Sequence, residues 1–274
     1  MLTIEAVSYR YAGALRPSLR EVSLELRDGE VVGLVGPGEA GKSTLCLVAS
    51  GLAPRTIGGR LAGRVLLDGA DTAGRPMHAL ATEVAIGFQN PGTQLSGVAP
   101  SVYEEVAFGP MNLGISRPEV IARTEDALGA LGISALAARD PDRLSGGQQQ
   151  LVAMAGLLAL APRHLVLDEP TAQLDPAGTR LVSDALRRLA DAGASILIAE
   201  QKTDLLAAVC DRVVALSEGR VVLAGPAGEA LADPRLAALG VAPPASVRIR
   251  RCAEEAGVSA AAIDRALAAG GGAG

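Results

Sequence analysis

Aromatic residues are nearly absent from this chain, which has three Tyr, two Phe and no Trp among 274 residues. Ala, Val, Leu and Gly must therefore fill the core, and this favours helices packed closely on a sheet over a large β-sandwich. The length allows one large domain, or a domain with an appendage, and is sufficient to bury a substantial core.

Cysteine is also scarce. Cys46, Cys210 and Cys252 are scattered, odd in number and without a CxxC spacing. This pattern indicates neither a disulfide framework nor a zinc site. A reducing cytoplasm is the expected compartment.

Long apolar runs and blocks of one charge are missing too. The longest apolar run, "LVAMAGLLALA" (151–161), is shorter than the roughly 20 residues that span a bilayer. The N-terminus lacks the basic start and apolar run of a signal peptide. The net charge of −5 is spread over mixed signs, so we expect no nucleic-acid partner. Any membrane role must come through a partner protein.

Apolar patterns divide the chain into regions. They predict strands at 2–35 and a helical insert at about 95–160. At 164–225 they predict strands that alternate with helices, which is typical of a mainly parallel sheet. Residues 226–274 are predicted to form a short helical tail, with a helix at "SAAAIDRALAA" (259–269) and a frayed "GGGAG" end.

The stretch "GPGEAGKST" fits the phosphate-loop pattern GxxxxGK[ST], and it follows a buried strand and opens a predicted helix. Backbone N–H groups of such a loop wrap phosphates, helped by the helix dipole. Lys42 would reach the terminal phosphates, and Ser43 would offer its hydroxyl to Mg²⁺. The predicted nucleotide-binding residues are Gly36, Pro37, Gly38, Glu39, Ala40, Gly41, Lys42, Ser43 and Thr44.

A second motif, "LVLDEP" (165–170), ends a predicted strand with two carboxylates. Asp168 is placed to bind Mg²⁺, as strand-borne aspartates do in phosphate-loop enzymes. Glu169 is placed to orient and deprotonate the water that attacks the γ-phosphate of ATP. The two motifs together predict a Mg-ATP-hydrolysing P-loop NTPase core, with Lys42 and Glu169 as catalytic residues.

"LSGGQQQ" (144–150), which lies between these motifs, resembles the signature sequence of ABC-transporter ATPases. The resemblance covers about residues 2–225, and the predicted ABC ATPase domain is 1–225. It implies an α/β fold with an N-terminal antiparallel sheet and an α-helical subdomain inserted at about 95–160. It also implies that two ATPases pair head to tail, so that the signature of one completes the nucleotide site of the other. The signature residues are Ser145, Gly146, Gly147 and Gln148.

Three further positions match the family. Tyr11 is similar to the aromatic residue that stacks on adenine, although strands favour tyrosine anyway. Gln89 in "IGFQNP" is similar to the glutamine that contacts Mg²⁺ and the membrane subunit. The segment "AQLD" (172–175), which ends at Asp175, resembles the loop at the dimer interface.

The runs "FQNPGTQLSG" and "VYEEVAFGPMNLG" and the tail segment "LGVAPP" (239–244) resemble the energy-coupling factor (ECF) group of importers. That group takes up vitamins, cobalt or nickel. The resemblance implies a peripheral subunit on the cytoplasmic face of the membrane. Its partners would be a second ABC ATPase, a membrane T-component and a substrate-binding S-component.

Two positions depart from the family pattern. Gln201, in "ILIAEQKTD", stands where the family has a histidine that holds the γ-phosphate. A glutamine amide can still donate to a phosphate oxygen, so Gln201 is the third predicted catalytic residue, and one interpretation is that it is simply a tolerated polar substitute. Because an amide cannot relay a proton, our hypothesis is slow hydrolysis at this chain's own site. The neighbouring Glu200 would repel the phosphate and is not a substitute. His78, in a predicted loop, and His164, just before the predicted strand of "LVLDEP", are expected to be structural or exposed. Leu151 replaces a usual arginine with no consequence that the sequence reveals.

Other functions fit parts of the pattern. The chain could be a nucleotide-gated partner subunit with little turnover of its own, or the ATPase of another ABC transporter class. DNA-repair and chromosome-organising ATPases also carry a signature, but their ATP motifs are separated by long coiled coils, and no heptad run occurs here.

Overall fold

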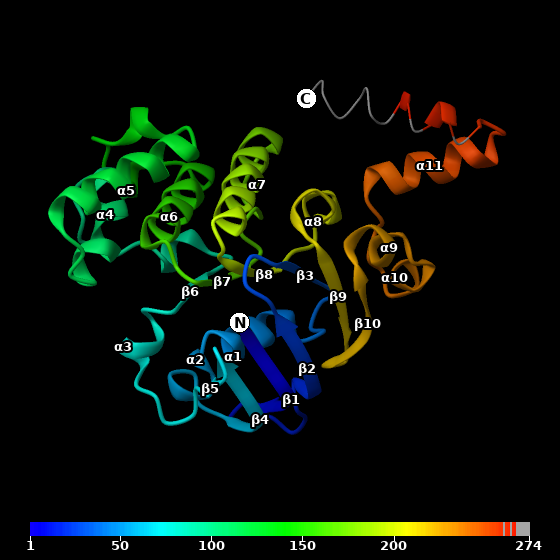
Figure 1. Ribbon diagram of the computed structural model, residues 1–274, viewed down its shortest axis with the longest axis horizontal. Coiled ribbons are helices and arrows are strands. Elements are labelled where there is room, and N and C mark those ends of the chain that lie inside the picture. The colour runs from blue at the N-terminus through cyan, green and yellow to red at the C-terminus, as the bar shows by residue number, and fades with distance from the viewer. Residues whose placement is uncertain (260, 264, 267–274) are drawn as a thin grey trace.

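The computed structural model describes residues 1–259, 261–263, 265 and 266 (Figure 1). Two sheets organise the molecule. The smaller sheet is antiparallel and comes entirely from the first quarter or so of the chain. Its strands, in spatial order, are β2 (Leu19–Leu26), β1 (Leu2–Arg10), β4 (Arg60–Leu67) and β5 (Ala70–Asp71).

The larger sheet carries the two ATP motifs. Five of its strands are mutually parallel, and the edge strand β10 pairs with β9 in the antiparallel sense. The spatial order is β10 (Arg220–Pro226), β9 (Arg212–Ser217), β3 (Val31–Val35), β8 (Ser195–Ala199), β7 (His164–Asp168) and β6 (Val84–Gly87). The predicted mixed α/β fold, with a parallel-rich sheet and an N-terminal antiparallel sheet, is confirmed.

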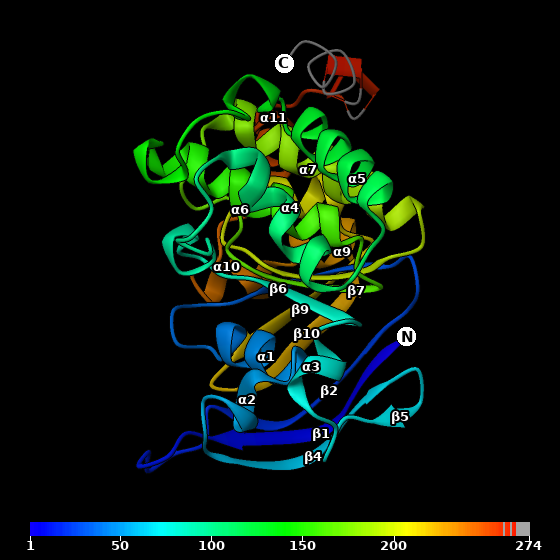
Figure 2. The ribbon, with the colours of Figure 1, turned by 90° about the vertical axis from the view of Figure 1, so that its left-hand side faces the viewer.

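Alternation along the central strands supplies two cores. In β3, Val31 and Val35 pack into one core, while Val32 and Leu34 pack into the other. Because successive side chains of a strand point to opposite faces, a strand buried on both sides must be apolar throughout. Figure 2 shows what covers each face: α1, α2 and the small sheet lie on one side, and α4–α7 lie on the other.

The helices follow the predicted regions, with the three longest of the insert, α4–α6, grouped together at one end of the molecule (Figure 1). Their bounds are α1 (Lys42–Ala49), α2 (Leu52–Arg55), α3 (Met77–Leu80), α4 (Val102–Asn112), α5 (Arg117–Ala130), α6 (Gly146–Leu160), α7 (Pro176–Asp191), α8 (Thr203–Val209), α9 (Ala227–Ala232), α10 (Pro234–Ala238) and α11 (Ala245–Glu255). Short 3₁₀ turns are η1 (Pro91–Thr93), η2 (Ser134–Leu136) and η3 (Pro141–Arg143).

Some local predictions are corrected. His78 lies in the short helix α3 and not in a loop. His164 belongs to strand β7 and not to the segment before it, because its N–H donates to the carbonyl of Glu83 at the start of β6. The segment expected to be a helix at 259–269 is helical at 261–263, 265 and 266, and the frayed end expected at 270–274 lies outside the described residues.

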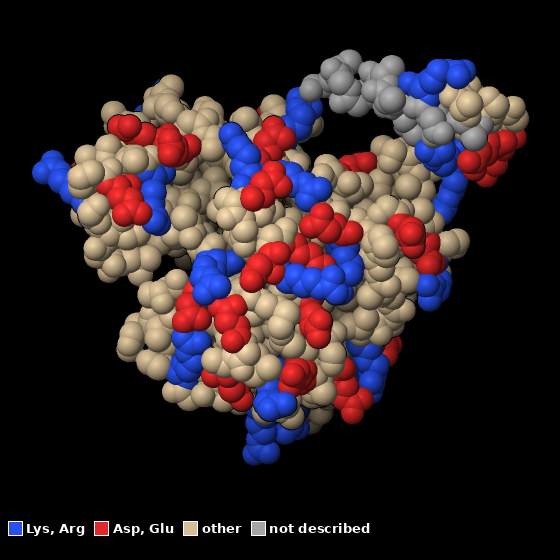
Figure 3. All heavy atoms as spheres, viewed as in Figure 1, with Lys and Arg blue, Asp and Glu red and all other residues tan. Residues whose placement is uncertain are grey.

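No helix in the described part of the chain is long and apolar enough to cross a bilayer. On the face seen in Figure 3, acidic and basic side chains are interspersed over both the small-sheet region and the helical region. The pattern agrees with the mixed charge of the sequence.

Candidate nucleotide site

The phosphate-loop sequence connects β3 to α1 and is fixed by two glycines. Gly36 has φ +149°, and a β-carbon there would lie 2.2 Å from the carbonyl oxygen of Leu216 in β9. Gly41 has φ +104°, and a β-carbon there would lie 2.7 Å from the carbonyl oxygen of Ser18. Only glycine combines these backbone angles with such close approaches. The loop is therefore wedged between β9 and the segment that enters β2.

Lys42 begins α1 and turns back into the loop. Its Nζ donates to the carbonyls of Gly36 and Pro37, each at 2.9 Å. The residue is buried, and burial lowers the pKa of its ammonium, while the nearby carboxylates of Glu169 and Asp168 raise it. The ammonium is thus a poorly hydrated positive charge, which favours an anionic ligand.

Asp168 ends β7 beside the loop. Burial raises the pKa of its carboxyl, while a hydrogen bond from Ser43 opposes that rise. The Ser43 hydroxyl and the Asp168 carboxylate are in contact and form a pair of hard oxygen donors, which is the ligand type that Mg²⁺ prefers. These residues fit the predicted metal.

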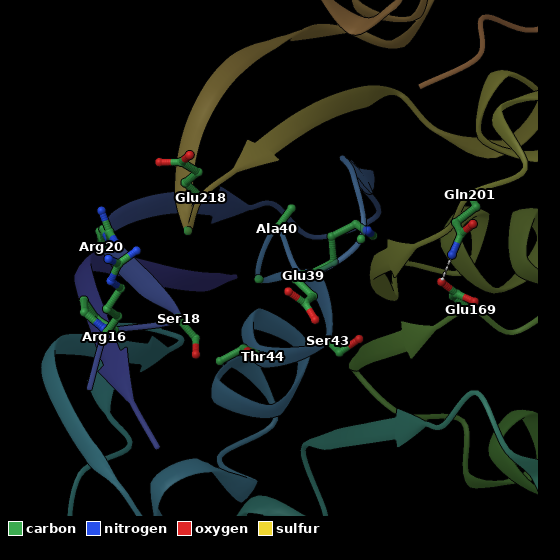
Figure 4. Close-up of a pocket in the computed structure, with 15 residues that line it drawn as sticks. Arg16, Ser18, Arg20, Glu39, Ala40, Ser43, Thr44, Glu169, Gln201 and Glu218 are labelled. Atoms are coloured by element: carbon green, nitrogen blue, oxygen red, sulfur yellow. Dashed lines mark hydrogen bonds between the residues drawn. The ribbon is translucent and has the colours of Figure 1, made fainter. Parts of the chain in front are cut away.

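Glu169 is held in an unusual backbone conformation. Its φ is +50°, which is uncommon outside glycine, and its N–H donates to the carbonyl of Ala199 at the end of β8. Its carboxylate accepts a hydrogen bond from Gln201 Nε2 at 2.5 Å and another from Gln89 Nε2 at 2.7 Å. Figure 4 shows the Gln201 side chain directed at Glu169 across the strand ends. One N–H of the Gln201 amide is therefore directed at Glu169, and the phosphate contact suggested by the sequence stays a prediction.

The phosphate loop, Glu169 and Gln201 open onto one cavity of about 650 Å³ (Figure 4). The walls are completed by six residues that were not predicted: Arg16, Pro17, Ser18 and Arg20, with Glu218 and Gly219 from the β9–β10 turn. Gly219 N–H donates to Ala40 O at 3.1 Å and so links the hairpin to the loop, but the sequence carries no signal that β9 lies next to β3.

The other predicted residues lie elsewhere. The hydroxyl of Tyr11 is 3.1 Å from Thr44 Oγ1, and its ring packs edge-on against Tyr9, so it borders α1 but does not line the cavity. The side chain of Asp175 caps α7 by accepting from Gly178 N at 2.7 Å. Neither contact tests the roles in adenine binding and at the dimer interface that the resemblance implied.

The signature residues are outside the cavity, at the start of α6. Ser145 Oγ accepts from Gln148 N at 3.3 Å, while Gln148 Oε1 accepts from Ser145 N at 3.1 Å, a reciprocal capping box. Leu151 is partly buried against the helical core, so an apolar side chain at this position is accommodated by packing.

Comparison with known proteins agrees with this arrangement. The family model for ABC transporters matches residues 19–172, a span that includes both ATP motifs and the signature. The chain belongs to the ABC transporter family. It is an ATP-binding subunit of this family, whose cassettes bind and hydrolyse ATP.

Two similar proteins are named as ATP-binding proteins of transport systems. An ABC transporter ATP-binding protein of Pyrococcus horikoshii is 39% identical over 251 residues, covering 91% of this chain and 88% of the relative. The cobalt import ATP-binding protein CbiO of Rhodobacter capsulatus is 41% identical over 248 residues, covering 89% and 85%.

Solved structures share the ABC fold. CbiO1 of Clostridium perfringens, described as part of the CbiONQ transporter complex, superposes with a TM-score of 0.73 at 33% identity, covering 86% of this chain and 92% of that one. A dimeric ATP-binding cassette bound to ADP and Pi superposes with a TM-score of 0.72 at 25% identity, covering 83% and 99%. Cassettes of this family thus form dimers.

Proposed function

We propose that this chain is the ATP-hydrolysing subunit of an ECF-type importer for a vitamin, cobalt or nickel. The observation that carries the proposal is that Lys42 and Glu169 line one cavity, with Asp168 close enough to Lys42 to raise the pKa of its ammonium, in a chain 41% identical to a cobalt import ATP-binding protein. The quoted ECF-like runs around Gln89 and α4 support the subgroup.

The residues suggest a division of labour. Loop N–H groups and the poorly hydrated Lys42 ammonium hold the phosphates of ATP. Glu169 orients a water and takes its proton as the water oxygen attacks the γ-phosphorus and the bond to ADP breaks. The two amide donors on Glu169 fix the direction of that carboxylate.

Mg²⁺ would be held by Ser43, Asp168 and the carbonyl oxygen of the Gln89 amide, whose nitrogen is used on Glu169. When bound, the metal neutralises charge on the phosphate oxygens. Asp168 fits this role because its partly buried carboxyl has a raised pKa, which a bound cation would lower.

The partners proposed are a second ABC ATPase in a head-to-tail dimer, a membrane T-component and an S-component that reads the substrate. This arrangement would put the chain peripherally on the cytoplasmic face of the membrane. The position of Ser145–Gln148 outside the chain's own cavity supports a role in a partner's site.

A second candidate is a nucleotide-gated subunit whose own site turns over slowly. The hydrogen bond from Gln201 to Glu169 favours this second candidate. The group beside the proposed general base is then a neutral amide, which cannot carry a proton. In a dimer, faster hydrolysis would then occur at the site completed by this chain's signature.

One experiment tests the ATPase assignment. Steady-state ATP hydrolysis is measured for the wild type, Lys42→Ala and Glu169→Gln, with ATP binding followed in parallel. Glu169→Gln should retain binding and lose turnover by about 100-fold or more, as expected for loss of a general base. Turnover that survives in Glu169→Gln would contradict the assignment.

The importer class is tested by its partners. Co-purification from membranes should recover a T-component and an S-component as separate small membrane proteins. Recovery of an export-type partner with one large membrane domain would replace the ECF proposal with another ABC class and leave the ATPase assignment intact.

A further inference from the structure

Lysine is rare in this chain. Only two of its 25 basic residues are lysines, Lys42 and Lys202, and Lys202 directly follows Gln201. Lys202 is partly buried, and its Nζ donates to the carbonyl of Thr171 at 2.6 Å and to the carbonyl of Leu174 at 3.2 Å. Both lysines of the chain thus bind pairs of backbone carbonyls.

An ammonium suits this arrangement. It is compact and has three rotatable donors, whereas the planar fork of arginine matches carboxylates. The two carbonyls belong to one tight turn, which the N–H of Leu174 closes by donating to Thr171 O at 3.1 Å. We call this turn the 171–174 loop. Lys202 therefore connects it to the segment that follows β8.

Glu200 also binds the 171–174 loop. It is 2% exposed, and its carboxylate accepts from Thr171 Oγ1 at 2.6 Å and from the N–H groups of Gln201 and Lys202 at 2.8 and 3.1 Å. A buried carboxylate needs several donors, and these three provide them. Residues 200–202 thus each bind the segment that runs from Glu169 to Leu174.

The loop also contacts the signature, through Gln173. A β-carbon on Gly146 would lie 2.3 Å from Gln173 Oε1, and one on Gly147 would lie 3.1 Å from Gln173 O. Gln150, which is 2% exposed, donates from Nε2 to the carbonyl of Pro170 at 2.9 Å. The 171–174 loop is therefore in contact with both the end of β8 and the first turn of α6.

We propose that Lys202 is a positioning residue that holds the 171–174 loop against the signature. It would thereby couple the nucleotide site containing Glu169 to the signature that this chain presents to a paired subunit. The second part rests on the proposed function, because it requires paired ATPases. The physical basis is a continuous set of contacts, Lys202 to Thr171 and Leu174, and Gln173 to Gly146 and Gly147.

The test compares Lys202→Met with Arg180→Met in the full-length chain. Arg180 is an exposed cation that borders the same neighbouring cavity as Lys202, and within the described residues no hydrogen bond joins it to the 171–174 loop. Hydrogen exchange of the nucleotide-free proteins is followed by mass spectrometry. In Lys202→Met, amides of 171–175 and of 145–149 should exchange about threefold faster or more, as expected when a local restraint is lost. Amides of 36–44 should keep their wild-type exchange.

Turnover provides the second measurement. Lys202→Met should lower kcat about five- to tenfold and leave the KM for ATP within about twofold, because the residue touches neither the phosphate loop nor the cavity. Lys202→Arg should recover only part of this loss, since guanidinium does not fit the paired carbonyls. Arg180→Met should match the wild type in both measurements.

The proposal is overturned if the exchange rate at 171–175 is unchanged in Lys202→Met, or if it increases there while the rate at 145–149 is unchanged. Equal changes in Arg180→Met would also overturn it, since they would show a general effect of removing charge. Exchange needs no turnover, so an inactive wild type would refute the proposed function and leave this test of Lys202 standing.

Discussion

At the scale of single residues, the nucleotide site holds two side chains in surroundings that disfavour their charged forms. Lys42 is buried and Asp168 is partly buried, and the pKa of each is displaced in the direction that favours its neutral form. A carboxyl with a raised folded-state pKa favours folding below its unfolded pKa, and that contribution is lost as the pH rises through the folded value. At neutral pH, ionised Asp168 therefore destabilises the nucleotide-free protein.

Asp168→Asn should accordingly raise the melting temperature of the nucleotide-free chain at about pH 7.5, by roughly 1–3 °C, and abolish Mg-dependent turnover. Differential scanning calorimetry without nucleotide checks the first effect. Asp184→Asn, on the exposed face of α7, is the matched control and should change neither property. A lower melting temperature for Asp168→Asn would show that its contact with Ser43 outweighs the burial cost.

Gln201 permits a gain-of-function test. Gln201→His should raise kcat about tenfold or more with little change in ATP affinity, because imidazole can carry a proton beside Glu169 and an amide cannot. Steady-state hydrolysis across ATP concentrations measures both quantities. If the wild type already hydrolyses at the rate of the variant, the slow-site hypothesis is wrong.

At the scale of elements, the position of the phosphate loop depends on β9. Gly36 faces the carbonyl of Leu216, and Gly219 of the following turn donates to Ala40. The loop is therefore shaped by a hairpin far along the chain as well as by its own glycines.

Gly36→Ala should lower the free energy of unfolding by about 2–3 kcal/mol, because a β-carbon 2.2 Å from a backbone oxygen forces one strand to move. Denaturant unfolding measures this loss. Gly38→Ala is the control: a β-carbon added at Gly38 would have no neighbouring atom within 4 Å, so the stability of this variant should match the wild type. Equal losses in both variants would mean that loop entropy, and not the clash, sets the effect.

At the scale of the whole molecule, a buried histidine lies where the small sheet meets the large one. His164 Nδ1 is 2.7 Å from Ser195 Oγ, and Nε2 has no hydrogen-bond partner among the described residues. The neighbouring Arg163 pairs at 2.9 Å with Asp68, which follows β4 of the small sheet. Burial, with the N-terminal amine next in weight, lowers the pKa of His164.

A histidine with a depressed folded-state pKa contributes stability above its unfolded pKa, near 6.5, and loses it as the pH falls through the folded value. Wild-type stability should therefore decrease from about pH 7.5 to about pH 5.5, and His164→Gln should show a smaller decrease. Urea unfolding at the two pH values measures the difference. His78→Gln, which changes the exposed histidine of α3, should keep the wild-type dependence. An equal pH dependence in wild type and His164→Gln would exclude this role.

The residues alone predicted the phosphate loop, the Asp168–Glu169 pair, the signature and the alternating strands that lead to them. Each is a short pattern whose backbone requirements are local, so residue types and spacing suffice. The folded chain was needed to show that Arg16, Arg20 and Glu218 line the cavity, that Gln201 binds Glu169, and that Lys202 binds the 171–174 loop. These contacts depend on strand order, which is set by the total burial of both sheet faces and leaves no local pattern in the sequence.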